Sequence, residues 1–226
     1  MKQLSLWFSW ITLVVFTAFF VAKGNREFLL YAVSLAVLIG VVQASDRRMR
    51  YAAAVKWCFW LWLVMHMCGG FVHLNGVRLY DLVLVRLVGE PYQILRYDQF
   101  VHAFCYFTIG GLLHAVVSAL AAPAAPRWGV ALLTFLAALG VGAVNELIEF
   151  AAVAGFGTDG VGDYTNNALD NVFNALGALA ALAWTGSRRN VNRSTSSGIP
   201  PEDGDTVESQ RACPHQSPHQ SSKRVV

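Results

Sequence analysis

Six long apolar runs constrain the fold of this chain more than any other feature. A helix needs about 20 mostly apolar residues to cross a lipid bilayer. The runs cover residues 4–22, 28–44, 52–74, 98–122, 128–154 and 166–185. Of the 226 residues, 55% are hydrophobic and 14% are charged, whereas soluble domains carry about 25% charged residues. The expected fold is therefore all-α: a polytopic transmembrane helical bundle of about six spans, and not a soluble globular enzyme.

The two ends of the chain differ from the middle. The first run has the Lys and the apolar core of a signal peptide, but its core is longer than the usual one and rich in aromatic residues, so we expect an uncleaved signal anchor. Residues 186–226 are rich in Ser, Pro and Gln and poor in large apolar residues. Such a segment cannot bury enough surface to offset its ordering entropy, and we expect a disordered tail.

Charge and cysteine content exclude several other classes of protein. The formal net charge is only +3, and no basic stripe interleaved with aromatic residues is present, so nucleic-acid binding is not expected. Four scattered cysteines, with no paired spacing, predict neither a disulfide framework nor a zinc knuckle. They are Cys58, Cys68, Cys105 and Cys213. The lipid bilayer is the expected partner, and the oligomeric state stays open.

The distribution of basic residues near the span ends predicts the orientation. With the N-terminus in the cytoplasm, nine Lys and Arg residues fall on the cytoplasmic side and five on the outer side. Both termini are therefore expected in the cytoplasm. Lys56, near the start of the third run, is expected to extend its ammonium group to the interface.

The segment 75–97 is too charged to span the membrane. Its aliphatic residues alternate irregularly with Asp81, Arg86 and Glu90, which favours a short amphipathic helix lying in the outer interface. Such a helix would form a lid or an entrance over the outer ends of the spans.

Ionisable and amide side chains inside the last four runs converge on the outer side. Such residues are costly in a span and are therefore functional-site candidates. The set comprises His66 and His73 in the third run, Asp98 and His102 in the fourth, Asn145, Glu146 and Glu149 in the fifth, and Asn166, Asp170 and Asn174 in the sixth. We predict an outward-facing polar and acidic pocket in this four-helix half, with the first two spans as scaffold.

The chemistry of this set leaves two uses open. The candidate metal ligands are Asp98, His102, Glu146, Glu149 and Asp170, which suit a divalent ion such as Mg²⁺, Mn²⁺ or Zn²⁺. Two neighbouring carboxylates also suit acid–base work, with His102 or Glu149 as the base and Glu146 beside them. His66, Asn145, Asn166 and Asn174 are expected to line the pocket.

Structural roles are the alternative for several of these residues. Asp98 could be a helix N-cap, His102 a hydrogen-bonded buried histidine, and Asn166 and Asn174 links between helices. The pair Glu146 and Glu149 is harder to explain structurally, because two carboxylates one turn apart repel each other unless a cation, a proton or a basic group intervenes.

Several separated elements resemble the YjdF-like family of bacterial inner-membrane proteins of unknown function. The family has a His-x-x-Gly ending one span, a Tyr in the next loop, an Asp-Arg-Phe-x-His opening the following span, a Tyr-Glu-Leu-Ile-Glu and a late Asp-containing span. The matching elements here are residues 66–70, Tyr80, Pro91, residues 97–102, residues 146–149, Asp170, Asn174 and Gly177. The resemblance covers about residues 52–184 and implies a multi-pass protein of the bacterial plasma membrane.

A weaker similarity is to the VanZ-like proteins, which are tied to glycopeptide resistance and the cell envelope. They share the Asp-x-x-x-His that opens a span and the Asp-x-x-x-Asn-x-x-Gly of the last span. This chain departs from both families at Gln99, where a basic residue is usual, and in a reduced acidic and aromatic segment before the last span. The ligand could therefore differ as well.

Three functions remain open from the sequence. The first is a metal-dependent or acid–base site acting on an envelope or lipid-like substrate. The second is a small-solute transporter coupled to protons or cations. The third is a non-catalytic assembly or interaction protein in which the polar residues only fix helix packing.

Overall fold

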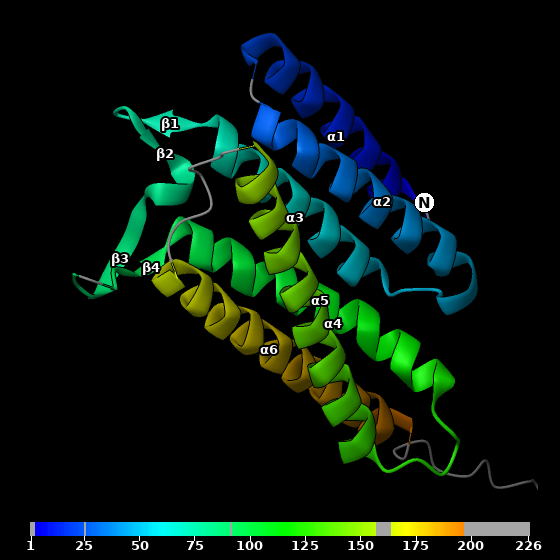
Figure 1. Ribbon diagram of the computed structural model, residues 1–226. Helices are drawn as coiled ribbons and strands as arrows, with labels where there is room; N and C mark the ends of the chain where they lie inside the picture. Colours follow the sequence, from blue (N-terminus) through cyan, green and yellow to red (C-terminus); the bar gives the residue numbers. More distant parts are fainter. Residues whose placement is uncertain (1–2, 25, 91, 157–163, 197–226) are drawn as a thin grey trace, which may run out of the picture.

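The computed structural model describes residues 3–24, 26–90, 92–156 and 164–196. Within them the chain forms six long helices and two small antiparallel hairpins (Figure 1). The helices are α1 (Leu4–Lys23), α2 (Arg26–Met49), α3 (Ala53–Phe71), α4 (Tyr97–Leu120), α5 (Arg127–Phe156) and α6 (Tyr164–Ser196). The predicted all-α membrane bundle is confirmed in its helical character, with the hairpins as an addition.

The two hairpins lie between α3 and α4 and project from one end of the bundle, called here the hairpin end (Figure 1). β1 (His73–Leu74) pairs with β2 (Val77–Arg78), and a 3₁₀ turn, η1 (Leu79–Asp81), follows. β3 (Val83–Val88) then pairs with β4 (Ile94–Arg96). The first hairpin turns at Asn75 and Gly76, with φ of 52° and 82°, which is the left-handed pair that a type I′ turn requires.

The predicted interfacial helix in residues 75–97 is therefore wrong. Residues of β3 alternate poorly between apolar and polar, which suggested a helix, but Val and Leu also favour extended backbone. The Asn-Gly turn and the pairing with β4 settle the segment as two hairpins. His73, expected in the third span, lies in β1, because α3 ends at Phe71.

Small residues allow α4 and α6 to pack closely, and this is the most extensive helix pair of the bundle. A Cβ atom at Gly177 would lie 2.0 Å from the carbonyl oxygen of Ala103. One at Gly110 would lie 2.8 Å from the Cβ of Ala181. The backbones thus meet directly, as in small-residue interfaces of membrane helices. α5 packs against both α4 and α6 and crosses them in Figure 1.

An internal ion pair closes the turn between α2 and α3. Lys56 Nζ lies 2.8 Å from Asp46 Oδ2, and both side chains are buried, at 7% and 6% exposure. Asp46 Oδ1 also accepts a hydrogen bond from the backbone N–H of Tyr51. The expectation that Lys56 extends to the interface is wrong, because Asp46 offers its ammonium group a partner inside the bundle.

Five helices, α1 to α5, are long and apolar enough to cross a membrane. α6 is not among them, because its first half carries a row of Asn and Asp side chains. α6 also continues to Ser196, so the tail predicted from residue 186 is helical over its first 11 residues, from 186 to 196. The predicted disorder of residues 197–226 falls outside the described residues.

Tryptophans are distributed unevenly along the bundle axis. Six of the seven lie in the parts of their helices far from the hairpin end: Trp7 and Trp10 in α1, Trp57 and Trp60 in α3, Trp128 in α5 and Trp184 in α6. Trp7, Trp57 and Trp128 are exposed, as expected for an aromatic belt at one membrane interface. The guanidinium of Arg188 lies 4.4 Å from the Trp184 ring at the same end.

Candidate metal centre

The first turns of α4 place two candidate ligands. The side chain of Gln99 caps the helix, because its Oε1 accepts hydrogen bonds from the backbone N–H groups of Leu95 (2.7 Å) and Arg96 (3.1 Å). The N-cap position itself is Arg96. Asp98 is therefore not the N-cap that the sequence allowed, and its carboxylate is available to the other residue of the same face, His102.

The facing part of α6 supplies a matching row. Asn166, Asp170 and Asn174 are spaced four residues apart and lie on one face of the helix. The close contact of α4 and α6 brings this row against His102. Asp170 and Asn174 are buried, at 1% and 0% exposure, so their polar groups depend on partners within the protein.

Asp98, His102 and Asp170 form a compact group, called here the triad. His102 Nε2 lies 3.7 Å from Asp98 Oδ1 and 4.0 Å from Asp170 Oδ2. One donor atom from each residue lies within 4.8 Å of the others. Ligands held at about 2.1 Å from a tetrahedral ion are separated by about 3.4 Å. Small side-chain rotations would therefore bring the triad to coordination distance.

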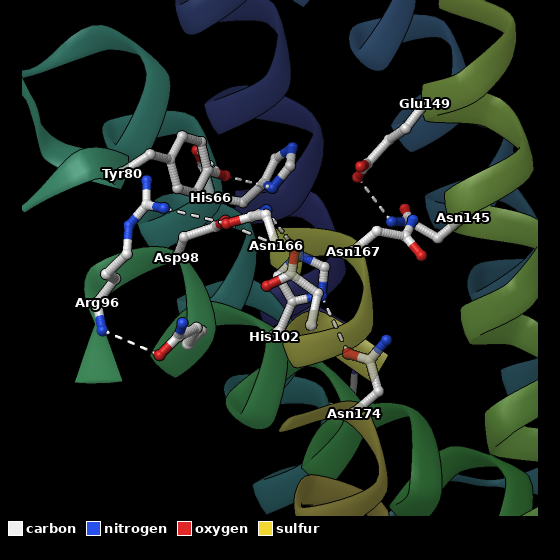
Figure 2. A network of polar contacts seen from close by, with 12 residues as sticks. His66, Tyr80, Arg96, Asp98, His102, Asn145, Glu149, Asn166, Asn167 and Asn174 are labelled. Carbon is white, nitrogen blue, oxygen red and sulfur yellow. Dashed lines mark hydrogen bonds and ion pairs between the residues drawn. The ribbon is translucent and has the colours of Figure 1, made fainter. Parts of the chain in front are cut away.

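Hydrogen bonds with neighbouring asparagines fix the orientation of the triad side chains (Figure 2). His102 Nδ1 lies 3.0 Å from Asn174 Oδ1. Since an amide oxygen only accepts, Nδ1 donates to it, and Nε2 is the ring nitrogen that faces the two carboxylates. Asn166 Nδ2 donates to Asp170 Oδ2 at 2.7 Å. Asp170 Oδ1 is buried and has no hydrogen-bond partner among the described residues.

The two carboxylates of α5 stand beside the triad and are not part of it. Glu149 accepts a hydrogen bond from Asn145 on its own helix at 2.8 Å. Glu146 accepts one from Asn167 at the start of α6. Figure 2 shows Glu149 and Asn145 on the neighbouring helix, across from His102. Both glutamates are close enough to interact electrostatically with His102, so four carboxylates share one region with few compensating cations.

The hairpins are joined to α3 near the triad by Tyr80 and His66. The Tyr80 hydroxyl donates to the His66 carbonyl oxygen at 2.9 Å and lies 2.6 Å from His66 Nδ1. Burial, and then the charge of Asp98, raises the pKa of Tyr80 well above its ordinary value, so the hydroxyl stays protonated. A Cβ at Gly69 would lie 2.5 Å from the Tyr80 ring, which explains the glycine one turn after His66.

A second link runs through Arg96. Its guanidinium donates to Asp81 Oδ1 at 2.8 Å and to Asn166 Oδ1 at 3.1 Å. Asn166 in turn donates to Asp170. Asp81 also pairs with Arg78 at 3.0 Å. The position of the hairpins and the orientation of the Asp170 carboxylate are therefore coupled through two side chains.

Residues 4–191 match the family model described as "Predicted membrane protein (DUF2238)". The chain belongs to the DUF2238 family. The YjdF-like proteins are this family, so the resemblance seen in the sequence is confirmed. No curated protein and no solved structure gave a match.

In this DUF2238 protein, sequence reasoning missed three contributors to the site. Asp81 and Arg96 were assigned to a surface segment, because the hairpins that return them to the triad were not foreseen. Asn167 was seen as part of the polar start of α6 but not as a partner of Glu146. The sequence signal for Asp81 and Arg96 was that they flank an extended apolar stretch. That pattern does not indicate where the stretch folds back against the helices.

Proposed function

We propose that this protein is a metal-dependent enzyme of the bacterial plasma membrane that acts on an envelope or lipid-like substrate. The observation that carries the proposal is the buried Asp170 Oδ1 atom, which has no hydrogen-bond partner among the described residues and belongs to a carboxylate beside His102. A buried carboxylate oxygen without a partner is costly, and a bound cation would satisfy it.

The donor set favours a particular kind of ion. Two carboxylates and one imidazole match Zn²⁺ or Mn²⁺ better than Mg²⁺ or Ca²⁺, which prefer oxygen ligands alone. The bond from His102 Nδ1 to Asn174 is the type of outer contact that orients a metal-bound histidine. Three protein ligands leave coordination positions for water and substrate, as in catalytic sites.

The surrounding residues have roles that follow from their positions. A bound ion would polarise an ester or phosphoryl oxygen and activate a water molecule. Glu149 is then assigned as the general base, because His102 is occupied by Asn174 on one nitrogen and by the ion on the other. Arg96 and Asn166 hold the Asp170 carboxylate in place.

Continuous helices support an enzyme over a transporter. Transporters commonly bind their substrates at interrupted helices near the middle of the membrane. Here α4 and α5 run without a break, and the triad lies near the hairpin end, within two or three turns of the start of α4 and of α6. The nine-to-five distribution of basic residues supports a hairpin end that faces outward, with both termini in the cytoplasm.

Metal content tests the ion directly. Protein purified in mild detergent without chelator is expected to carry Zn²⁺ or Mn²⁺ at close to one ion per chain, measured by elemental mass spectrometry. The variants Asp98→Asn and Asp170→Asn are expected to lose it, because each removes a charged ligand. Glu90→Gln, an acidic residue of the β3–β4 turn outside the triad, is the matched control and should retain the ion. A wild-type protein that stays metal-free after addition of both ions would contradict the proposal.

The reaction is tested by Glu149→Gln. We expect this variant to retain the ion and to lose conversion of its substrate by about 10²-fold or more, the contribution typical of a general base. Lipid and envelope extracts from cells that lack the protein, complemented with wild type or with the variant, would be compared by mass spectrometry. Identical extracts in all strains would argue for a binding or assembly role.

A further inference from the structure

We propose that the β3–β4 hairpin lies flat in the headgroup region of the bilayer, with its aliphatic side chains in contact with lipid. This goes beyond the proposed function and does not depend on it. The sequence of β3, Val-Leu-Val-Arg-Leu-Val, carries apolar side chains at both odd and even positions.

Successive side chains of a strand point to opposite faces. A hairpin resting on protein would therefore bury one face and expose a polar one. The register of β3 against β4 is irregular between Val83 and Val88, yet aliphatic side chains are exposed at both sets of alternate positions. Leu84 and Val88, on either side of Arg86, are exposed by 42% and 45%, and Val85 and Leu87 by 52% and 64%. Lipid molecules can contact aliphatic side chains on both faces of a hairpin at the membrane surface, whereas a protein partner would cover a single face or edge.

The connections of the hairpin fix its depth. Only one residue separates α3 from β1, and β4 is followed directly by α4. The whole segment is thus held at the level where two membrane helices end. It cannot enter the hydrocarbon core, because a two-stranded sheet leaves its edge N–H and C=O groups unpaired. The headgroup region offers both water for those edges and apolar contact for the side chains.

The charged groups agree with a flat orientation. Arg86 lies in the middle of β3 and is exposed, where it can reach lipid phosphates. Glu90 lies at the turn, where Gln93 donates a hydrogen bond to it. A carboxylate at the tip disfavours insertion of the tip and favours a hairpin that lies along the surface.

Depth-dependent fluorescence quenching tests this placement in the full chain. The four cysteines are replaced by alanine, and single cysteines at Leu87 and Glu90 are labelled with an environment-sensitive NBD dye. The protein is reconstituted into vesicles of phosphatidylcholine and phosphatidylglycerol. The dye at Leu87 is expected to emit at shorter wavelength than the dye at Glu90. It should also be quenched more strongly by a spin label at the lipid headgroup than by one near the acyl-chain end.

Val37, an exposed residue in the middle of α2, provides the internal standard, with the reverse preference between the two spin labels. The proposal is overturned if the dye at Leu87 is quenched by aqueous iodide as strongly as the dye at Glu90 and not by either lipid label. It is equally overturned if cysteines at Leu87 of two copies cross-link and exclude the lipid labels, because β3 would then pair with a second chain. Both outcomes leave the metal measurements unaffected.

Discussion

Replacing Gly177 with alanine is expected to destabilise the bundle severely, because the added Cβ would lie 2.0 Å from the carbonyl oxygen of Ala103 and 2.9 Å from the backbone nitrogen of Phe107. Both are backbone atoms of α4, so a change of side-chain rotamer cannot relieve the contact. Overpacking usually costs about 1–3 kcal/mol, and the free energy of unfolding should fall by about 3 kcal/mol or more here, where whole helices must separate. Thermal unfolding in detergent measures the loss.

Gly140→Ala is the matched control for this change. Gly140 lies in α5, and a Cβ there would meet nothing within 4 Å. Since alanine is favoured over glycine in a helix by up to about 1 kcal/mol, this variant should be as stable as the wild type or slightly more so. Equal stability of the two alanine variants would show that α4 and α6 do not approach each other as closely as described.

Lys56→Met is expected to have the second large effect. The methionine fills a similar volume but leaves the buried Asp46 carboxylate without its cation. Removal of one partner from a buried ion pair costs about 3–5 kcal/mol. The double variant Asp46→Asn with Lys56→Met should regain most of this loss, because the asparagine side-chain oxygen can still accept the bond from Tyr51. Unfolding of the single and double variants would be compared with that of the wild type.

A small effect of Lys56→Met would have a clear meaning. Either Asp46 would be reached by water, or another cation would replace Lys56. A double variant no better than the single one would show that the pair contributes through packing and not through charge.

The helices could be predicted from the sequence because each is encoded locally, by a run of apolar residues of sufficient length. The hairpins could not, although Asn75 and Gly76 are a strong turn signal by themselves. The signal was lost because aliphatic residues mixed with charges suit an interfacial helix as well as a strand. The choice between them depends on pairing of β3 with β4, which is a contact across a turn.

Most residues of the site could be predicted from the sequence, but which of them lie together could not. The members of two pairs are four residues apart, so each pair is expected to share a helix face. The pairs are Asp98 with His102 and Asp170 with Asn174. Which pairs meet is decided by the close approach of α4 and α6 at Gly177. From the sequence, Glu146 and Glu149 were predicted to bind the metal together with the other acidic residues. In the structure they lie next to the triad and accept hydrogen bonds from Asn167 and Asn145, respectively.

The uneven distribution of tryptophans determines what intrinsic fluorescence can report. Trp62, whose ring centroid lies 5.7 Å from that of His66, is the exception among the seven, and Trp62→Phe would leave emission from the far end of the bundle only. In that variant, filling the triad with an ion should leave the emission spectrum unchanged. A spectral shift on metal addition would then mean that occupancy at one face of the membrane is transmitted along the helices to the other.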